Sequence, residues 1–235
     1  MRYDRVMTLV LIAIPLCSAL AVPGETENPA TRPATLTSYD LPTEWKGAQE
    51  GTQDGNPFVQ DGRPLWRVDH VWPDDWQDPD NFKPLIWARG RWALPRKSEG
   101  EHHDRPDVRI VNKIASLGAF ASRWGTPKDQ QFTNKAPALV FIAPAAGTFV
   151  LNFQAESHLW TGDGPVRILI LKHDQAAREM KMLANEEIKP AEIVKFAEMA
   201  VRLNETDELL LLPQIDKQNV GCVIDLSELS IVKNQ

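Results

Sequence analysis

Tryptophan is the residue type in this sequence whose number and placement most suggest binding chemistry. The chain has eight tryptophans against two tyrosines, and many of them stand beside loop and turn residues, where binding side chains are commonly carried. A flat indole can stack on the apolar C–H face of a sugar ring, while neighbouring polar side chains bond the hydroxyl groups. The residues that we predict to form a ligand site on this basis are Trp72, Trp76, Trp87, Trp124, Trp160 and Asp163. The alternative is that these rings close the ends of the hydrophobic core.

Catalytic signatures are missing from the sequence. It contains no G-x-S-x-G, H-E-x-x-H, P-loop or G-x-G-x-x-G pattern. Ser157, His158 and Asp163 supply the residue types of a hydrolytic triad, but a triad is a spatial arrangement that sequence proximity does not establish. A carboxylate pair for glycoside hydrolysis likewise depends on a separation in space. We therefore predict a protein that is not an enzyme, with a secreted hydrolase as the less favoured alternative.

A group of carboxylates suggests calcium, because hard cations take several oxygen ligands. The group consists of Asp74, Asp75, Asp78 and Asp80. The usual calcium-loop pattern fails here, since Trp76 interrupts the carboxylates and Leu85 stands where a bidentate glutamate is needed. The run His102-His103-Asp104 is a weak metal site, because adjacent side chains on an extended chain point apart. We predict no cofactor and no metal ligands, and a structural Ca²⁺ held by separate loops is the alternative.

The first 21 residues have the pattern of a signal peptide. Arg2 and Arg5 precede the apolar run Val6–Leu16, and Ala19–Ala21 offers a small-x-small cleavage site. The apolar run is shorter than the roughly 20 residues that span a bilayer. We predict a secreted, periplasmic or cell-envelope protein with no membrane span in the mature chain, and the plain signal fits a bacterial source. Cleavage leaves Cys222 alone, which excludes an internal disulfide.

Composition divides the rest of the chain into a linker and one domain. Residues 22–57 are rich in proline, threonine and glutamate, a composition that buries little and stays flexible. Within this linker, Leu41–Trp45 could dock against the domain that we predict over residues 58–235. The formal net charge of −6 argues against a nucleic-acid partner, since an acidic chain repels phosphates. The partners that remain are a glycan or other extracellular ligand, or another exported protein.

The elements that must position the tryptophans read mainly as strands. Thr148–Ala155 alternates between apolar and polar residues, as a strand with one buried face does. Val166–Lys172 is apolar at nearly every position, which indicates a strand covered on both faces. Ile193–Leu203 fits both a helix, through Ile193, Phe196, Ala197 and Ala200, and a strand, through Met199, Val201 and Leu203. We favour the strand, because the turn Asn204–Asp207 would lead into a second strand, Glu208–Leu212, that pairs with it.

Three further segments complete this assignment. Val220–Val232 supplies one or two closing strands, and Gln175–Glu187 is the best helix candidate because Ala176, Met180 and Leu183 fall on one side. Val108–Trp124 stays open between helix and strand. The fold class that follows is all-β: an antiparallel β-sandwich, or jelly roll, with long tryptophan-rich loops and at most one or two short helices.

The order of motifs in the second half of the chain resembles the carbohydrate-binding-module type of jelly roll, within the galactose-binding-like β-sandwich group. The resemblance covers about residues 136–232, and its matching positions are Gly147–Phe153, Trp160–Gly164, Val166–Leu171, Val201–Leu209 and Asp225–Leu226. Thr206 departs from the pattern, because it stands where the group usually has a turn glycine before Asp207. The resemblance implies a β-sandwich; the group includes sugar binders and many domains with no known ligand.

Together these observations predict a secreted, non-catalytic β-sandwich that acts as a carbohydrate-binding or cell-envelope ligand-binding module. The main alternative is a structural or interaction protein of an exported complex. A glycan binder should carry exposed tryptophan rings beside polar groups, whereas an interaction protein should carry a contiguous apolar patch. A hydrolase should show a deep pocket with carboxylates whose pKa values are shifted.

Overall fold

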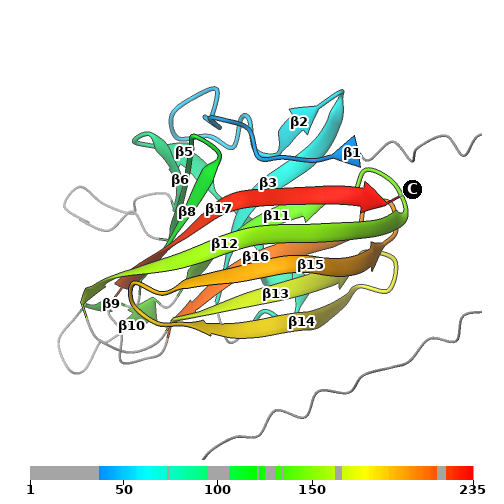
Figure 1. Ribbon diagram of the computed structural model, residues 1–235. Helices are drawn as coiled ribbons and strands as arrows, with labels where there is room; N and C mark the ends of the chain where they lie inside the picture. The colour runs from blue at the N-terminus through cyan, green and yellow to red at the C-terminus, as the bar shows by residue number, and fades with distance from the viewer. Residues whose placement is uncertain are drawn as a thin grey trace, which may run out of the picture. The chain divides into compact units, whose positions relative to one another are not determined.

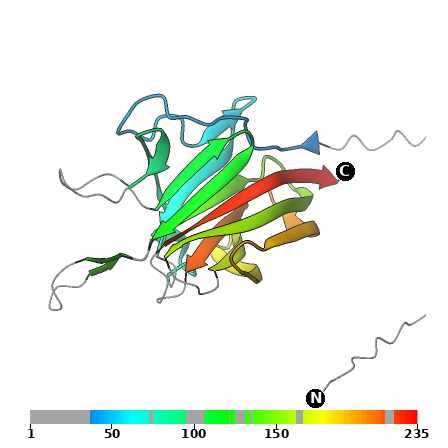
Figure 2. The same cartoon turned by 60° about the vertical axis from the view of Figure 1, so that its left-hand side comes forward.

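The computed structural model describes residues 37–72, 75–94, 106–120, 122–124, 131–133, 135–161, 166–215 and 221–234. These residues form two antiparallel sheets packed face to face (Figures 1 and 2). The fold is therefore the antiparallel β-sandwich of jelly-roll type that the sequence predicts. The described helical residues amount to one 3₁₀ turn, η1 (Pro79–Asn81). In the described part of the chain there is no helix with the length and hydropathy to cross a bilayer.

Sheet A contains the longest strand of the fold. Its order is β15 (Ile193–Leu203), β12 (Gly147–Thr161), β17 (Gly221–Asn234), β8 (Ile114–Phe120), β7 (Asp107–Val111), β6 (Arg91–Ala93) and β5 (Ile86–Ala88). The short strand β1 (Thr37–Ser38) pairs with β17. A separate hairpin joins β9 (Ser122–Trp124) to β10 (Gln131–Thr133).

Sheet B lies behind sheet A in Figure 1. Its order is β14 (Glu179–Ile188), β13 (Val166–Asp174), β16 (Glu208–Ile215), β11 (Ala136–Ile142), β3 (Arg63–Val71) and β2 (Phe58–Gln60). The short strand β4 (Lys83–Pro84) pairs with β3. The central strands β13, β16, β11 and β3 therefore have neighbours on both sides.

Alternation along the strands produces two apolar layers. On β12, Phe149, Leu151 and Phe153 are buried in the core between the sheets, as the sequence alternation predicts. On β13, Ile168 and Ile170 enter this core, while Leu169 and Leu171 belong to a second cluster with residues of β3, β11 and β16. The expectation that β13 is covered on both faces is confirmed. The second cluster lies on the outer face of sheet B, beneath the chain between β3 and β4, which contributes Trp76 and Phe82.

The predicted helix at Gln175–Glu187 is wrong. Residues 175–178 form a turn, and β14 follows as a strand paired with β13. Met180 and Leu183 do not share a helical face: Met180 packs on the outer cluster and Leu183 on the core between the sheets. Pairing with β13, with Met180 and Leu183 half-buried on opposite faces, outweighs the helix propensity of this segment. The open segment Val108–Trp124 forms strands β7, β8 and β9 in its described residues.

The predicted strand Ile193–Leu203 is confirmed as β15, but its predicted pairing with the next strand is wrong. β15 pairs with β12 in sheet A, whereas β16 pairs with β11 and β13 in sheet B. The turn Asn204–Asp207 therefore crosses from one sheet to the other. Thr206 has a φ of 72° there, and the Asp207 carboxylate accepts a bond of 2.8 Å from the Asn204 N–H. This bond supports a turn that glycine would adopt more readily.

The folded unit begins earlier than the boundary expected at Phe58. Thr37 and Ser38 pair with β17, Leu41 and Trp45 are buried in the core, and the Trp45 Nε1–H donates to the Gly55 carbonyl at 2.7 Å. Residues 37–57 were expected to be linker because their overall composition is polar. Burial of the two large apolar side chains, together with the pairing to β17, offsets the entropy of fixing the backbone of this segment.

Trp66 inside β3 and Trp72 just after it are expected to differ in their effect on stability. Trp66 is 0% exposed and its ring centroid lies 5.3 Å from that of Phe141, whereas Trp72 is 36% exposed. Trp66→Ala should lower the free energy of unfolding by about 3–5 kcal/mol, because it opens a cavity in the core. Trp72→Ala should cost less than about 1 kcal/mol. Urea unfolding followed by circular dichroism measures both, and equal losses for the two variants would contradict this placement of Trp66.

Candidate functional site

The outer face of sheet B carries a pocket of about 320 Å³. Small-molecule sites typically have volumes of roughly 300–1,000 Å³. Three parts of the chain form it: the outer face of the sheet, the 3₁₀ turn η1, and the turn between β13 and β14. Its lining residues are Arg67, Pro79, Asp80, Phe82, His173, Gln175, Arg178, Met180, Glu208 and Leu210.

Strand register places the polar residues of the floor side by side. His173 of β13 is the cross-strand partner of Glu208 on β16, and Arg67 of β3 is opposite Val140 on β11. Because Trp66 and Val68 point into the core, alternation turns Arg67 and Asp69 to the outer face. β11 lies between β3 and β16, so the Arg67 side chain must pass over β11 to reach Glu208.

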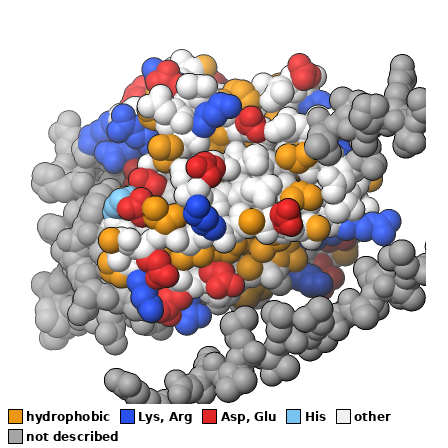
Figure 3. Space-filling model, viewed as in Figure 1, with side chains coloured by type: hydrophobic (Ala, Val, Ile, Leu, Met, Phe, Trp, Pro, Cys, Tyr) orange, Lys and Arg blue, Asp and Glu red, His pale blue; other side chains and the backbone are white. Residues whose placement is uncertain are grey.

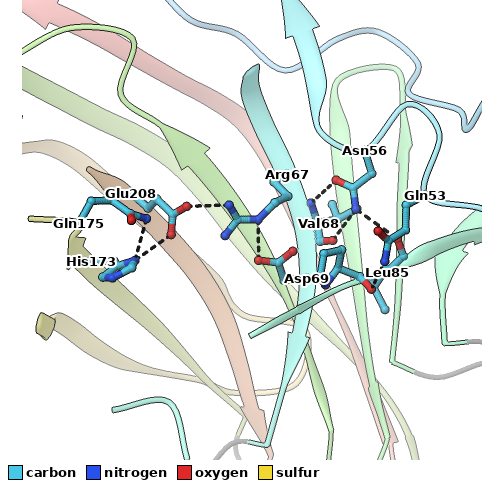
Figure 4. A network of polar contacts seen from close by, with 10 residues as sticks. Gln53, Asn56, Arg67, Val68, Asp69, Leu85, His173, Gln175 and Glu208 are labelled. Carbon is cyan, nitrogen blue, oxygen red and sulfur yellow. Dashed lines mark hydrogen bonds and ion pairs between the residues drawn. The ribbon is translucent and has the colours of Figure 1, made fainter. Parts of the chain in front are cut away.

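A chain of charged contacts runs across this floor (Figure 4). Arg67 donates from Nε to Asp69 Oδ2 and from Nη1 to Glu208 Oε1, each at 2.7 Å. The other oxygen of Glu208, Oε2, lies 3.0 Å from Nδ1 of His173, which also lies 3.1 Å from Nε2 of Gln175. The Arg67 guanidinium therefore joins β3 to β16, and the Glu208 carboxylate joins β16 to β13.

Burial sets the electrostatics of these groups. Burial by itself would lower the pKa of Arg67, but the carboxylates of Asp69 and Glu208 hold that pKa above its usual value. Burial raises the pKa of Asp69 to about 6, against the attraction of Arg67 and with a small contribution from Glu208 in the same direction as burial. Of the described atoms, none bonds the buried Oδ1 of Asp69. Asp69 is thus held by Arg67 through its Oδ2 atom alone.

The pocket has two walls with separate supports. The wall from the 72–85 segment rests on the outer cluster through Trp76 and Phe82, and Asp78 caps its turn by accepting from the Asp80 N–H at 2.9 Å. The wall from the β13–β14 turn is held by Asp174, which accepts from the Ala177 N–H at 3.0 Å. Arg178 Nη2 lies 2.5 Å from Asp80 Oδ2 and joins the two walls.

None of the described tryptophans is among the lining residues of the pocket. Trp72 is exposed just after β3, with the Lys135 amine 5.3 Å from its ring centroid. Trp76 is half-buried on the outer cluster, in the segment that forms one wall. Trp87 is half-buried against the core, its ring centroid 5.3 Å from that of Trp92.

The remaining predicted site residues are not fully described. Trp124 lies in β9 and Trp160 in β12, and their side chains are outside what the structure describes. Asp163 lies outside the described residues altogether. The structure therefore does not bring the six predicted residues into one place, and they stay a prediction.

Sequence reasoning missed the charged floor of the pocket. Arg67, His173 and Glu208 each stand beside or within a strongly apolar run, at a position where alternation points away from the core. A charged residue in a strand with neighbours on both sides needs a partner, because burying an unpaired charge is costly. That signal could have selected the three residues, although it could not have shown that they meet.

The carboxylates considered for calcium are used differently in the described residues. Asp80 pairs with Arg178, and Asp78 caps the turn that contains Asp80. Within the described ranges, no three His, Cys, Asp or Glu side chains come together as a metal site would require. Asp74 and the His102–Asp104 run are outside the described residues.

No protein-family model matches the chain, and no curated protein matches it in sequence. Solved structures similar to it include the N-terminal cellulose-binding domain of the Cellulomonas fimi β-1,4-glucanase C, at 11% identity and a TM-score of 0.33, covering 74% of this chain and 92% of that one. A family 29 carbohydrate-binding module is similar at 13% identity and a TM-score of 0.29, covering 72% and 90%. An Arthrobacter globiformis T6 isomalto-dextranase complexed with panose matches at 10% identity and a TM-score of 0.33, covering 85% and 32%. Likeness at these TM-scores carries no inference about the function of this chain, which depends on the pocket itself.

The second prediction concerns two adjacent residues of β3 whose titrations oppose each other. Folding raises the pKa of Asp69 to about 6 from 3.8, so unfolding releases a proton between these values and stability falls as pH rises from about 4 to 6. Burial, with Lys135 and Lys83, lowers the pKa of His70 to about 4 from 6.5. Unfolding then takes up a proton, and stability rises over about pH 4 to 6.5. The two contributions should largely cancel in the unaltered protein.

Single substitutions should separate the two slopes. Asp69→Asn should leave the rising contribution of His70, and His70→Gln should leave the falling contribution of Asp69, each approaching about 1.4 kcal/mol per pH unit at most. Urea unfolding at closely spaced pH values from 4 to 7 measures the slopes relative to the unaltered protein, in which all other groups are the same. Two variants with parallel slopes would contradict these pKa directions.

Proposed function

We propose that this protein is an exported, non-catalytic glycan-binding module and that its ligand, an uncharged sugar, lies in the pocket on the outer face of sheet B. The observation that supports this most is the lining of the pocket, in which matched positive and negative side chains alternate with apolar ones. Sugars require both kinds of surface, because each ring has hydroxyl groups around its edge and C–H groups on its faces.

Charge matching favours an uncharged ligand over an anion. Arg67 is bonded to two carboxylates, Asp69 and Glu208, and Arg178 is paired with Asp80. The pocket therefore has no excess of positive charge to attract a phosphate or a carboxylate ligand. The same pairs fix donors and acceptors in place before the ligand arrives, and hydroxyl groups can both donate and accept.

Apolar side chains stand beside these polar groups. Phe82 and Pro79 come from one wall, Met180 from β14 and Leu210 from the floor. Phe82 is half-buried against the outer cluster and presents an aromatic ring at the pocket. A ring face of a sugar could pack here while its edge reaches Gln175 and Glu208. Trp72 and Trp76, on the segment that leads into this wall, would extend the same surface for a longer ligand.

One observation keeps an interaction protein as the second candidate. Ile193 on β15 and Met182 on β14 are exposed, and these strands are the edges of the two sheets. Figure 3 shows a mainly polar face over β12 and β17, with hydrophobic side chains gathered towards β15. Edge strands with exposed apolar residues are places where another chain can pair. On β15 such a partner would bind the edge of sheet A, away from the pocket on sheet B, so Ile193→Ser tests the interaction protein separately from glycan binding.

The third prediction tests glycan binding with variants that leave the fold intact. The chain is titrated by calorimetry with cello-, xylo-, malto- and isomalto-oligosaccharides, and one class should bind saturably. Gln175 is exposed in a turn, so Gln175→Ala should weaken binding about fivefold or more through the loss of a hydrogen bond worth about 1 kcal/mol, without changing the unfolding midpoint. Gln49→Ala, an exposed glutamine outside the pocket lining, is the matched control and should bind as the unaltered protein does.

Three results would count against the proposal. Saturable binding that is equally strong in Gln175→Ala and Gln49→Ala would move the site elsewhere, with Trp72 and Trp160 as the next residues to replace. No binding in any class would remove the glycan proposal and favour the interaction protein. Release of reducing sugar during the titrations would instead identify a hydrolase, with Glu208 and Asp80, the two carboxylates of the pocket lining, as the residues to replace.

A further inference from the structure

The two walls of the pocket are joined by one ion pair between residues far apart in the sequence. Asp80 belongs to η1 and Arg178 to the β13–β14 turn, 98 residues later, and both line the pocket. Their side chains meet at 2.5 Å, between Arg178 Nη2 and Asp80 Oδ2. The gap between the walls is therefore bridged at this point.

The bridge is not what holds the walls in position. One wall rests on the outer cluster through Trp76 and Phe82, and the other is bonded to the body of the sandwich through the Gln175 N–H, which donates to Asp207 Oδ1 at 3.3 Å. The side chains of Arg178 and Asp80 are 65% and 71% exposed. An ion pair this exposed contributes little to stability. The ion pair therefore matters for the shape of the pocket more than for the stability of the fold.

The shape of the pocket limits how a polymer can lie in it. A glycan chain bound through an internal residue must leave the pocket in two directions, whereas a chain bound through its terminal residue leaves in one. The cavity of about 320 Å³ is at the small end of ligand sites, and the exposed Asp80–Arg178 pair joins its two walls. For a chain that continued between these walls, an internal segment would have to break the bridge, whereas a chain end could enter beside it.

We propose that the Asp80–Arg178 ion pair closes one side of the pocket and makes it selective for the ends of glycan chains. The inference rests on the proposed glycan-binding function and names the part of the glycan that is bound. Opening the bridge converts a site for chain ends into a groove that also accepts internal segments. Selectivity of this kind is a difference between two affinities, set by an obstacle to the unwanted ligand.

The experiment compares each polymer of the panel, namely cellulose derivative, xylan, amylose and dextran, with its own hexasaccharide at equal mass concentration. The unaltered protein should bind far fewer sites per unit mass on the polymer than on the hexasaccharide, in proportion to the number of chain ends. Arg178→Ala and Asp80→Asn should each raise, several-fold, the ratio of sites per unit mass on the polymer to sites per unit mass on the hexasaccharide. Because both residues line the pocket, the affinity for the hexasaccharide is measured in each variant and the comparison is made on site numbers at saturation. Arg202→Ala, an exposed arginine on β15 of the other sheet, is the matched control.

A charge-reversed pair completes the test. The double variant Asp80→Arg with Arg178→Asp restores an ion pair of the opposite sense, and position 178, with a φ of 54°, accepts aspartate readily. This double variant should regain the low site density on the polymer. A high site density in the unaltered protein, or no increase in either single variant, would overturn end selectivity while leaving glycan binding in place. A lack of binding to every polymer and every hexasaccharide would overturn glycan binding and the end selectivity that rests on it.

Discussion

The guanidinium of Arg67 is the interaction on which the outer face of sheet B depends. It crosses β11 to join Asp69 and Glu208, in a layer where the other side chains of the sheet are mostly aliphatic. Paired charges buried in this way give little net stability, because desolvation offsets most of their attraction, and apolar residues of similar size would often do as well. What they do contribute is position: Glu208 is held by Arg67 on one oxygen and lies against His173 on the other. A polar floor with fixed orientations is of use to a ligand, and we take that as its role.

This floor exists because sheet B is buried on both faces. The inner face packs on sheet A, and the outer face packs under the segment that carries Trp76 and Phe82. Covering only part of the outer face leaves a step between the covered and the open region, and the pocket lies at that step, between η1 and the β13–β14 turn. The apolar outer cluster supports one wall directly. Loss of that support would remove the pocket even if every polar contact of the floor remained.

The sequence predicted the strands better than their arrangement. Alternation in Thr148–Ala155 and the continuous apolar run of β13 follow from burial along a single strand, and both are confirmed. The helix predicted at Gln175–Glu187 is wrong because helix propensity depends on local sequence alone. It does not include the backbone hydrogen bonds that this segment forms with β13 as a strand. β15 and β16 were placed side by side because hairpins are the commonest connection, whereas this turn crosses between sheets. The assignment to the galactose-binding-like group stays a prediction.

The candidate site was harder to predict for a related reason. The prediction rested on the chemistry of tryptophan, yet Trp45, Trp66 and Trp92 are core residues. The charged part of the pocket lining comes instead from three separate strands and two turns. Contacts between Arg67 and Glu208, or between Asp80 and Arg178, join positions 141 and 98 residues apart. One sequence without relatives offers no means of pairing such positions.

The two ion-pair systems of the pocket differ in what they can do. Arg67, Asp69 and Glu208 are largely buried, so a change there alters the packing of the sheet together with any ligand contact. Asp80 and Arg178 are exposed, and they can change without effect on the core. In the proposed glycan-binding function, the floor would contact one sugar residue and the rim would decide whether a chain passes through. A change at the rim would then alter selectivity without altering the sandwich beneath it.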